Sequence, residues 1–335
     1  MEARFLAGKK ILVCGGCGFM GSDFILTLLE RVKDAEVVNV DALTYAADPN
    51  NLKDADTRRY RFVKGDIADG MLMQKLMKDA DAVVNFAAET HVDRSIHTPA
   101  EAFIRTNILG VHALLEALRA SPHIERMIHI STDEVWGDLP LDSKEKFTED
   151  SPFRPNSPYA ASKAGGDLLI RSYVRTHHVP VIVTHSVNNF GPRQYPEKLI
   201  PFFTMRALQG KTVPLYGTGK NMRDWLHVDD HSEAVLTVME KGELGMVYNI
   251  SQQKEYSNIF IAKNILRILK KPESLIEYVK DRPGHDLKYA VDSSKLRALG
   301  WKPRYSLEDK LPEVVEWYKK NVREGSTAAN AHIGL

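Results

Sequence analysis

The chain has 335 residues, of which 43% are hydrophobic and 27% charged, a composition typical of a soluble protein with a sizeable core. The formal net charge of +1 gives no reason to expect nucleic acid or an anionic membrane as a partner. No apolar run approaches the roughly 20 residues that span a bilayer. With two cysteines and no secretory signal, we expect a cytoplasmic protein without a disulfide framework.

Short apolar runs alternate with amphipathic stretches of helix length through the first half of the chain. The runs predict strands over residues 10–14, 36–41, 60–64, 82–86, 126–131 and 180–184. The stretches between them predict helices over residues 19–33, 71–78, 100–120 and 158–176. Because near-continuous apolar strands separated by helices are typical of sheets covered on both faces, we predict an α/β fold with a doubly wound, Rossmann-like parallel sheet.

A glycine-rich turn joins the first predicted strand to the first predicted helix. Gly15, Gly18 and Gly21 have the spacing G-x-x-G-x-x-G, which allows a tight turn and a close approach of a pyrophosphate to the helix N-terminus. Asp41 ends the second predicted strand, where a carboxylate accepts hydrogen bonds from a ribose hydroxyl and repels a 2′-phosphate. The pattern favours NAD over NADP, and a purely structural glycine turn is the alternative.

Cys14 and Cys17 have the C-x-x-C spacing of some redox and metal sites. Both fall inside the glycine turn, where small residues are needed, and no further cysteine completes a common zinc set. We therefore predict that they pack as small residues, and we expect no metal site.

The helix predicted over residues 100–120 is apolar over much more than a single stripe. Its apolar residues are Phe103, Ile104, Ile108, Leu109, Val111, Leu114, Leu115 and Leu118. Such a helix must be buried on two sides. We predict a homodimer through the helices near residues 100–120 and 158–176, and burial under the C-terminal region is the alternative.

Two adjacent carboxylates follow the strand predicted over residues 126–131. Side chains at consecutive strand positions point to opposite faces, so Asp133 and Glu134 share one site only if the chain has left the strand there. With the hydroxyl of Thr132 they form a set suited to acid–base chemistry. An exposed acidic pair at a strand end is the alternative.

Tyr159 and Lys163 are separated by one helical turn and are therefore neighbours on one helix face. An ammonium beside a phenol favours the phenolate, so we expect Tyr159 to act as a base near neutral pH. The small residues Ala160 and Ala161 favour the approach of a ligand. An aromatic core residue beside a solvated lysine is the alternative.

After about residue 180 the alternation of strands and helices loosens. Helical patterns over residues 259–269 and 307–322 predict a smaller C-terminal α/β region. We expect an NAD-binding Rossmann domain over residues 1–180 and a mainly substrate-binding region over 181–324, with segments that return to the first domain. Residues 325–335 are expected to form a flexible tail.

Ten segments in this order resemble the motifs of one enzyme family. They are residues 15–21, 41–44, 65–67, 87–95, 131–137, 159–163, 188–192, 196–201, 219–225 and 282–286. Over residues 8–320 the sequence resembles the extended short-chain dehydrogenase/reductase family, and within it the nucleotide-sugar 4,6-dehydratases, typified by dTDP-glucose 4,6-dehydratase. The Tyr159–Lys163 pair indicates only the superfamily, whereas Thr132-Asp133-Glu134 points to dehydration.

The resemblance implies a lyase that converts a nucleotide-diphosphate glucose, dTDP-glucose first among them, to the 4-keto-6-deoxy sugar with NAD. Tyr159, with Lys163, would serve oxidation at C4, and Thr132 would orient the C4 oxygen. The 4-ketone acidifies the C5 hydrogen, so Glu134 would act as the base at C5 and Asp133 as the acid for the C6 hydroxyl. The hydride would then return to C6.

The resemblance also implies two sets of binding residues. The cofactor would contact Gly15, Gly18, Phe19, Met20, Gly21, Asp41, Leu43, Thr44, Asp66, Ile67, Ala87, Ala88, Thr106, Tyr159, Lys163 and Asn189. The substrate would contact Thr90, Thr132, Asn188, Lys198, Leu199, Pro214, Tyr216, Arg223, Asn258, Arg282 and His285. His185 and Val187 depart from the family pattern, and we expect them beside the substrate cleft, where they bear on the choice of sugar or nucleotide.

Three alternatives differ from the leading interpretation in substrate or in class. A UDP-glucose 4,6-dehydratase would use the same groups. A nucleotide-sugar 4-epimerase shares the fold, the cofactor and the Tyr–Lys pair but needs no acid–base pair at C5 and C6, so Asp133 and Glu134 argue against it. A non-catalytic dinucleotide-binding regulator is disfavoured by the intact Tyr159 and Lys163.

Overall fold

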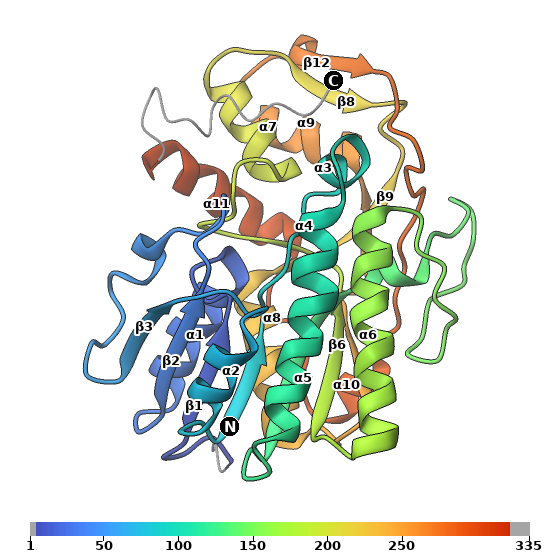
Figure 1. Ribbon diagram of the computed structural model, residues 1–335. Coiled ribbons are helices and arrows are strands. Elements are labelled where there is room, and N and C mark those ends of the chain that lie inside the picture. Colours follow the sequence, from blue (N-terminus) through green and yellow to red (C-terminus); the bar gives the residue numbers. More distant parts are fainter. Residues whose placement is uncertain (1–4, 322–335) are drawn as a thin grey trace.

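The computed structural model describes residues 5–321, so the tail expected over 325–335 lies outside the described residues. Its centre is a seven-stranded sheet in which every neighbouring pair of strands is parallel (Figure 1). In spatial order the strands are β10 (Val247–Ile250), β6 (Val181–Ser186), β5 (Arg126–Thr132), β4 (Ala82–Asn85), β1 (Lys10–Cys14), β2 (Glu36–Asp41) and β3 (Tyr60–Lys64). All six predicted strands are present. The seventh, β10, was missed because Asn249 interrupts its short apolar run.

Helices cover both faces of this sheet. One face packs on α1 (Phe19–Arg31) and α8 (Val228–Lys241), and the other packs on α2 (Gly70–Met77), α5 (Val111–Arg119) and α6 (Pro158–His177). Each face has its own apolar core, with Phe24 and Val235 on the first side and Met73, Leu114 and Ile170 on the second. The predicted doubly wound α/β fold is confirmed.

The helix predicted over residues 100–120 is not continuous. It consists of α4 (Glu101–Ile104), the π-helical turn η2 (Arg105–Gly110) and α5. The π-helical turn carries the buried Asn107, whose side chain bonds the backbone N–H and C=O of Glu89 at 3.1 and 3.0 Å and the hydroxyl of Ser162 at 2.9 Å. The prediction of one α-helix was wrong here because apolar periodicity does not reveal a single wider turn.

The outer side of this helix is uncovered in the described structure. Ile104 and Leu109 are 47% and 54% exposed. The alternative in which the C-terminal region buries this face is therefore wrong for residues 5–321.

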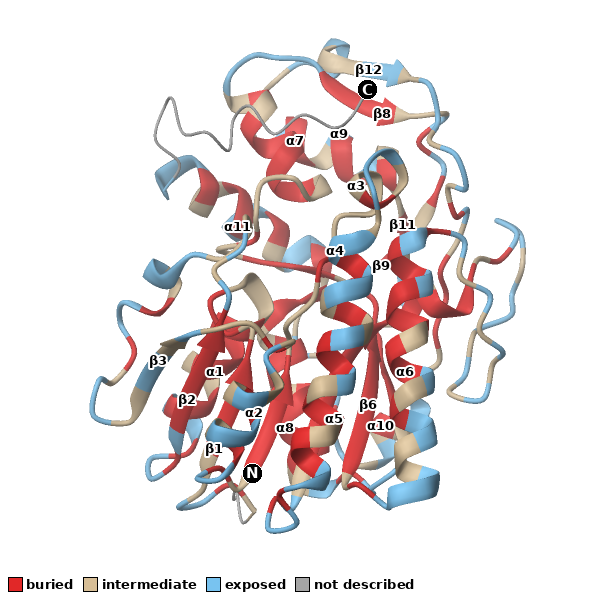
Figure 2. Cartoon of the chain, viewed as in Figure 1, coloured by how far each residue is buried: buried red, intermediate tan, exposed pale blue. Residues whose placement is uncertain are grey.

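The second half of the chain builds a smaller part beside the carboxyl ends of the sheet strands (Figure 1). It contains a three-stranded sheet of β11 (Glu255–Ser257), β9 (Met222–His227) and β7 (Asn188–Phe190), and a parallel pair of β12 (Ile276–Val279) and β8 (Val213–Tyr216). Helices α7 (Leu199–Leu208), α9 (Asn258–Ile268) and α11 (Leu307–Asn321) pack against them around a separate core, and their inner faces are buried (Figure 2). Both predicted C-terminal helices are present, and Val322 lies outside the described residues.

Short elements connect these layers. They are the helices α3 (Val92–His97) and α10 (Ser294–Ala298) and the 3-10 turns η1 (Pro49–Leu52), η3 (Asp133–Trp136) and η4 (Glu273–Leu275). Within residues 5–321, no helix combines the length and the apolar character needed to cross a membrane.

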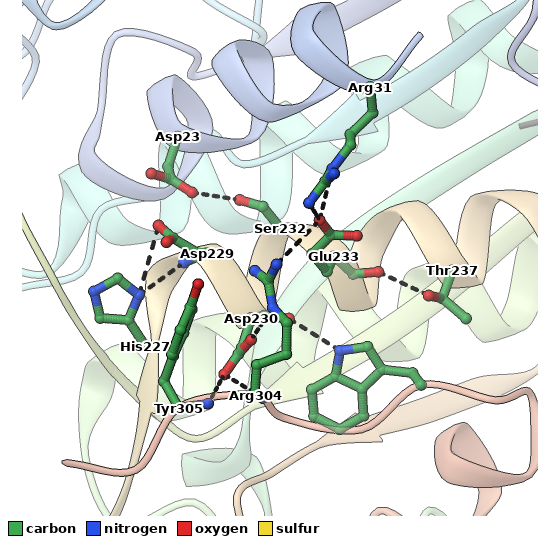
Figure 3. Close-up of polar contacts among 11 residues, drawn as sticks. Asp23, Arg31, His227, Asp229, Asp230, Ser232, Glu233, Thr237, Arg304 and Tyr305 are labelled. Atoms are coloured by element: carbon green, nitrogen blue, oxygen red, sulfur yellow. Dashed lines mark hydrogen bonds and ion pairs between the residues drawn. The ribbon is translucent and has the colours of Figure 1, made fainter. Parts of the chain in front are cut away.

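Helix α8 connects the C-terminal segment to the first layer through buried polar contacts (Figure 3). Asp230 accepts hydrogen bonds from the backbone N–H groups of Arg304 and Tyr305 at 2.9 and 3.0 Å, and from Arg304 Nε at 3.0 Å. Two residues further along α8, Ser232 donates to Asp23 of α1 at 2.8 Å. The segment around Arg304 is thereby held to the helix layer that covers β1.

Candidate active site

A cavity of about 310 Å³ opens at the carboxyl ends of β1, β4 and β5. In the sheet β4 follows β1, and the direction of chain order reverses there, which is where ligands bind in open α/β sheets. Residues that the sequence assigned to the cofactor, the substrate and catalysis come together here. The predicted residues that line this cavity are Gly15, Gly18, Phe19, Met20, Gly21, Asp41, Thr44, Asp66, Ile67, Ala87, Ala88, Thr90, Thr106, Thr132, Asp133, Glu134, Tyr159, Lys163, Asn188, Asn189 and Lys198.

The glycine turn forms a tight backbone cradle at the N-terminus of α1. Gly15 has a φ of +76°, and a Cβ there would lie 2.6 Å from the backbone nitrogen of Ala87. A Cβ on Gly21 would lie 2.4 Å from the carbonyl oxygen of Gly15. Asp41 borders the same cavity and is held by the backbone N–H groups of Cys17 and Leu43 at 2.9 and 2.8 Å. Free N–H groups for a pyrophosphate and a carboxylate for a ribose hydroxyl fit NAD.

Cys14 and Cys17 are buried and free. Burial raises the pKa of the Cys14 thiol and raises the pKa of Cys17 to about 11. Neutral, buried thiols agree with their interpretation as small packing residues in the turn.

Strand β5 ends directly before the acidic pair. β5 stops at Thr132, and the chain turns at once into η3, where the Thr132 hydroxyl accepts a hydrogen bond from the backbone N–H of Glu134 at 3.3 Å. Because the chain has left the strand, Asp133 and Glu134 line the same cavity as Tyr159. One carboxyl oxygen of each acid is buried without a hydrogen-bond partner within the described chain, so both are available to a ligand.

The two acids differ in what surrounds them. Burial and the charge of Glu134 raise the pKa of Asp133 well above its ordinary value. Burial also raises the pKa of Glu134, whereas the Arg282 guanidinium acts to lower it. Like charges this close disfavour ionisation of both groups, so the pair is suited to hold one proton.

Tyr159 and Lys163 lie on α6, which begins at Pro158 with Ser157 as its N-cap. The pKa of Tyr159 is raised, because burial and the charge of Glu134 outweigh the hydrogen bond from Thr132. Lys163 Nζ donates to the carbonyl of Ile130 at 2.8 Å, and burial lowers its pKa to about 8. The sequence predicts that the Lys163 ammonium favours the phenolate of Tyr159 near neutral pH. In this structure the ammonium is directed to a backbone carbonyl, and burial together with the charge of Glu134 favours the neutral phenol instead.

A second cavity of about 180 Å³ adjoins the first. The predicted substrate residues that line it are Asn188, Lys198, Leu199, Pro214, Tyr216, Arg223, Asn258, Arg282 and His285. Arg223 is held by the carbonyl of Asp286 at 2.8 Å and stacks on Tyr289, with the guanidinium 4.2 Å from the ring centre. Arg282 lies 3.5 Å from Asp93. Two guanidinium groups in one cleft can bind a diphosphate.

Glu134, Asn188 and Lys198 line both cavities, so Glu134 lies where the two meet, whereas Asp133 lines the first cavity only. Lys198 Nζ donates to the carbonyl of Thr90 at 2.8 Å, which ties the start of α7 to the loop after β4. A molecule that fills both cavities would present its middle to Glu134.

Several lining residues were not predicted from the sequence. They are Glu89, Gln194, Tyr195 and Glu197 in the first cavity, with Tyr289 in the second. Gln194, Tyr195 and Glu197 lie within or next to recognised motifs, so the motifs themselves were the available signal. Tyr289 follows the last motif by three residues and had no signal of its own.

Two predicted residues do not line the cavity expected for them. Leu43, which we expect at the cofactor, is not among the residues that line the first cavity, and its backbone N–H bonds Asp41 at 2.8 Å. His185 lines neither cavity: it is 1% exposed, faces Asp167 at 3.0 Å and packs on Trp136. Val187 borders the first cavity only.

Comparison with solved structures places the fold in its class. The chain superposes on DesIV, a dTDP-glucose 4,6-dehydratase from Streptomyces venezuelae solved with NAD and TYD, with a TM-score of 0.89 and 44% identity over 93% of this chain and 97% of that one. It also superposes on UDP-glucose 4-epimerase from Thermotoga maritima, with a TM-score of 0.85 and 29% identity over 94% and 100% of the two chains. The fold and the site define an extended short-chain dehydrogenase/reductase.

Sequence comparison narrows this class. Residues 12–314 match the family model described as GDP-mannose 4,6 dehydratase. The chain is 47% identical to dTDP-glucose 4,6-dehydratase of Xanthomonas campestris pv. campestris over 331 residues, which is 92% of this chain and 93% of that protein. It is 49% identical to the low-salt glycan biosynthesis protein Agl12 of Haloferax volcanii over 309 residues, 92% and 98% of the two chains. The chain belongs to the GDP-mannose 4,6-dehydratase family, and the resemblance inferred from its motifs is confirmed.

Proposed function

We propose that this protein is a hydro-lyase that uses NAD to dehydrate dTDP-glucose to the 4-keto-6-deoxy sugar. The observation that carries the proposal is the placement of Asp133, Glu134 and Tyr159 around one cavity, beside the glycine cradle. Relatives at 43% to 47% identity are named dTDP-glucose 4,6-dehydratase, and solved structures of such enzymes contain NAD.

The proposed catalytic residues act at different carbon atoms of the hexose. In this proposal Tyr159 takes the proton of the C4 hydroxyl as the phenolate, a form that the positive charge of bound NAD would favour over the neutral phenol, and Thr132 holds the same oxygen. The chemistry that NAD supplies when bound is acceptance of a hydride from C4 and its return to C6. Because a C4 ketone acidifies the C5 hydrogen, Glu134 can remove it while the protonated Asp133 donates to the departing C6 hydroxyl. The protonated Glu134 then returns a proton to C5 when the hydride adds to C6, which gives the 4-keto-6-deoxy sugar.

The second cavity holds the nucleotide diphosphate in this proposal. Arg223, Arg282 and Lys198 bring three cations to it, and Tyr216 offers an aromatic face beside Pro214. This division corresponds to a cofactor domain over residues 1–180 and a mainly substrate-binding region over 181–324, which we also propose.

Product analysis tests the proposed function. The purified chain is incubated separately with dTDP-glucose and UDP-glucose, and the products are measured by mass spectrometry and NMR. A product lighter by one water, formed faster from dTDP-glucose, is expected. Faster dehydration of UDP-glucose would assign the uracil nucleotide instead, and an unchanged mass with inverted C4 would identify a 4-epimerase. No conversion of either sugar would contradict all three enzymes.

We also propose a homodimer through α4, η2, α5 and α6. Ile104, Leu109 and Leu168 on these elements are 47%, 54% and 51% exposed, and a second copy would bury this apolar face. Light scattering at micromolar concentration should give twice the chain mass, and Leu109→Asp should give a monomer. Met71→Asp, which charges an 83% exposed residue on α2, should leave the dimer intact. A monomer mass for the wild-type chain at that concentration would contradict the proposed dimer.

For the location in the cell we propose the cytoplasm. Fractionation of cells that produce the tagged full chain tests this proposal, and recovery with the membrane fraction would contradict it.

A further inference from the structure

A cluster of buried polar side chains lies behind Lys163. It comprises His129 and Ser131 on β5, Asp167 one turn beyond Lys163 on α6, and His185 on β6. His129, Asp167 and His185 are 1%, 4% and 1% exposed. Asp167 and His185 line neither cavity, and the proposed reaction gives them no role.

Asp167 is the centre of this cluster. Its Oδ2 accepts hydrogen bonds from Ser131 Oγ at 2.7 Å and from His185 Nε2 at 3.0 Å. Burial acts to raise the pKa of Asp167, but the hydrogen bond from His185 and the basic groups around the carboxylate, Lys163 among them, outweigh burial and lower this pKa. The carboxylate is therefore ionised, although it is fully enclosed.

The other oxygen of Asp167 faces His129 and has no hydrogen-bond partner within the described chain. His129 Nε2 lies 3.7 Å from this Oδ1 and 3.4 Å from Lys163 Nζ. Its Nδ1 lies 3.1 Å from the side-chain amide of Asn85. The Asn85 amide is oriented because its oxygen accepts from the backbone N–H of Ala87 at 3.1 Å, so its nitrogen donates to His129 Nδ1.

The orientation of the Asn85 amide determines which ring nitrogen of His129 carries the proton. Burial lowers the pKa of His129 to about 3, so the ring is neutral, and with Nδ1 accepting, its single proton sits on Nε2. Nε2–H cannot accept from Lys163, which instead donates to the carbonyl of Ile130 at 2.8 Å. His129 Nε2 lies 3.7 Å from the free oxygen of Asp167, and the negative charge of Asp167 is what acts to raise the pKa of the Lys163 ammonium against burial.

We propose that Asp167, held by Ser131 and His185, is a positioning residue that keeps Lys163 charged, with His129 as the neutral spacer between them. The inference rests on the proposed function, because Lys163 serves the oxidation at C4 there. A buried cation without a compensating anion loses its proton more readily. Asp167 thus acts on the reaction through Lys163 and touches neither ligand.

Asp167→Asn tests this role, since it removes the charge and nearly preserves the shape. The charged and titratable groups facing the pair are His129 and His185, with Asp133 and Glu134 across Tyr159. Burial already lowers the pKa of Lys163 and Asp167 opposes that effect, so the variant should lower it further. The alkaline limb of kcat with dTDP-glucose should move to lower pH by about 1–3 units. NAD retained per purified chain should decline over the same pH range.

The controls separate the possible failures. Thr184→Val removes a buried hydroxyl without a partner from the strand that carries His185, and both pH profiles should stay in place. A wild-type chain that dehydrates neither sugar would reject the proposed function. A third outcome is an active wild type together with a folded Asp167→Asn variant that keeps its alkaline limb and its NAD retention. That result would reject the role of Asp167 and leave the proposed function standing.

A stability cycle covers the case in which Asp167→Asn folds poorly. If Asp167 compensates Lys163, then Lys163→Met combined with Asp167→Asn should unfold at higher urea concentration than Asp167→Asn by itself, because the uncompensated cation has been removed. A purely structural Asp167 predicts a further loss of stability in the double variant, and that result would overturn the inference.

Discussion

Asp133 and Glu134 are adjacent in the sequence, and the roles proposed for them require opposite protonation states. Asp133 is 2% exposed, and both burial and the neighbouring Glu134 favour its neutral form. For Glu134 the guanidinium of Arg282 counteracts part of the effect of burial. Of the two, Asp133 is therefore better suited to carry the proton and Glu134 to accept one.

Glu134→Gln should separate oxidation from elimination. The amide cannot remove the C5 hydrogen, so the variant should still reduce bound NAD partially with dTDP-glucose but incorporate no deuterium at C5 from heavy water. Nicotinamide absorbance and NMR of the recovered sugar measure the two steps. Glu145→Gln, at an exposed loop position, should incorporate deuterium like the wild type. Rapid exchange in Glu134→Gln would assign the base to another group.

Arg282→Gln should change the pH dependence. Arg282 lowers the pKa of Glu134, so its removal raises that pKa, and the ionised base is then lost at a higher pH. The acid limb of kcat/KM should move to higher pH by about one unit. Arg206→Gln on α7, whose guanidinium bonds Thr212, should leave the limb in place. A limb that stays or moves to lower pH in Arg282→Gln would show that another cation sets the protonation of Glu134.

At the scale of elements, three short departures from regular structure assemble the site. The turn between β1 and α1 brings backbone against backbone, and η3 breaks β5 after Thr132 so that both acids face one cavity. The π-helical turn η2 adds the amide of Asn107, which anchors the loop at Glu89. Each departure moves a polar group where a regular helix or strand could not place it.

Gly21→Ala should damage the cofactor cradle. The added Cβ would lie 2.4 Å from the Gly15 carbonyl oxygen and 2.8 Å from Gly16 Cα, both backbone atoms of the turn. We expect a loss of about 1–3 kcal/mol in the free energy of unfolding and purification without bound NAD. Gly70→Ala places its Cβ in open space at the start of α2, so it should keep NAD. Full NAD retention by Gly21→Ala would show that the turn can accommodate the added Cβ without losing the cofactor.

At the scale of the whole molecule, the site depends on how the two parts are held together. Strands of the large sheet supply the first cavity, and α7, α9 and the loop around Arg282 supply the second. A shift between them would separate Glu134 from Arg223 and Arg282, which we propose bind the diphosphate. Asp230 on α8 holds the segment at Arg304 that leads into α11 (Figure 3). Since α11 packs in the core of the second part, this joint connects the two.

Asp230→Ala should destabilise the fold without touching the site. Two backbone N–H groups and one guanidinium lose their acceptor, so the free energy of unfolding should fall by roughly 3 kcal/mol, measured by urea denaturation. Glu233→Ala, on the same helix, breaks half-exposed ion pairs with Arg31 and Arg304 and should cost less than about 1 kcal/mol. Equal losses in the two variants would contradict the importance of the Asp230 joint.

Much of the site could be predicted because each motif is local. The glycine spacing and Asp41 indicated the cradle, and Thr132–Glu134 and Tyr159–Lys163 supplied the catalytic candidates that the structure brings to one cavity. What could not be predicted depends on distant neighbours. The direction of the Lys163 ammonium depends on Ile130, and the burial of His185 depends on Asp167 and Trp136.

The amino-acid sequence by itself determined six of the seven strands of the large sheet, several of the helices, and the chemical groups present, because apolar periodicity and glycine spacing act over a few residues. Only the tertiary structure decided which groups lie together and in what state of charge. A protonation state depends on the solvent removed and the charges brought near by segments far apart in the chain, and neither is a local property of the sequence.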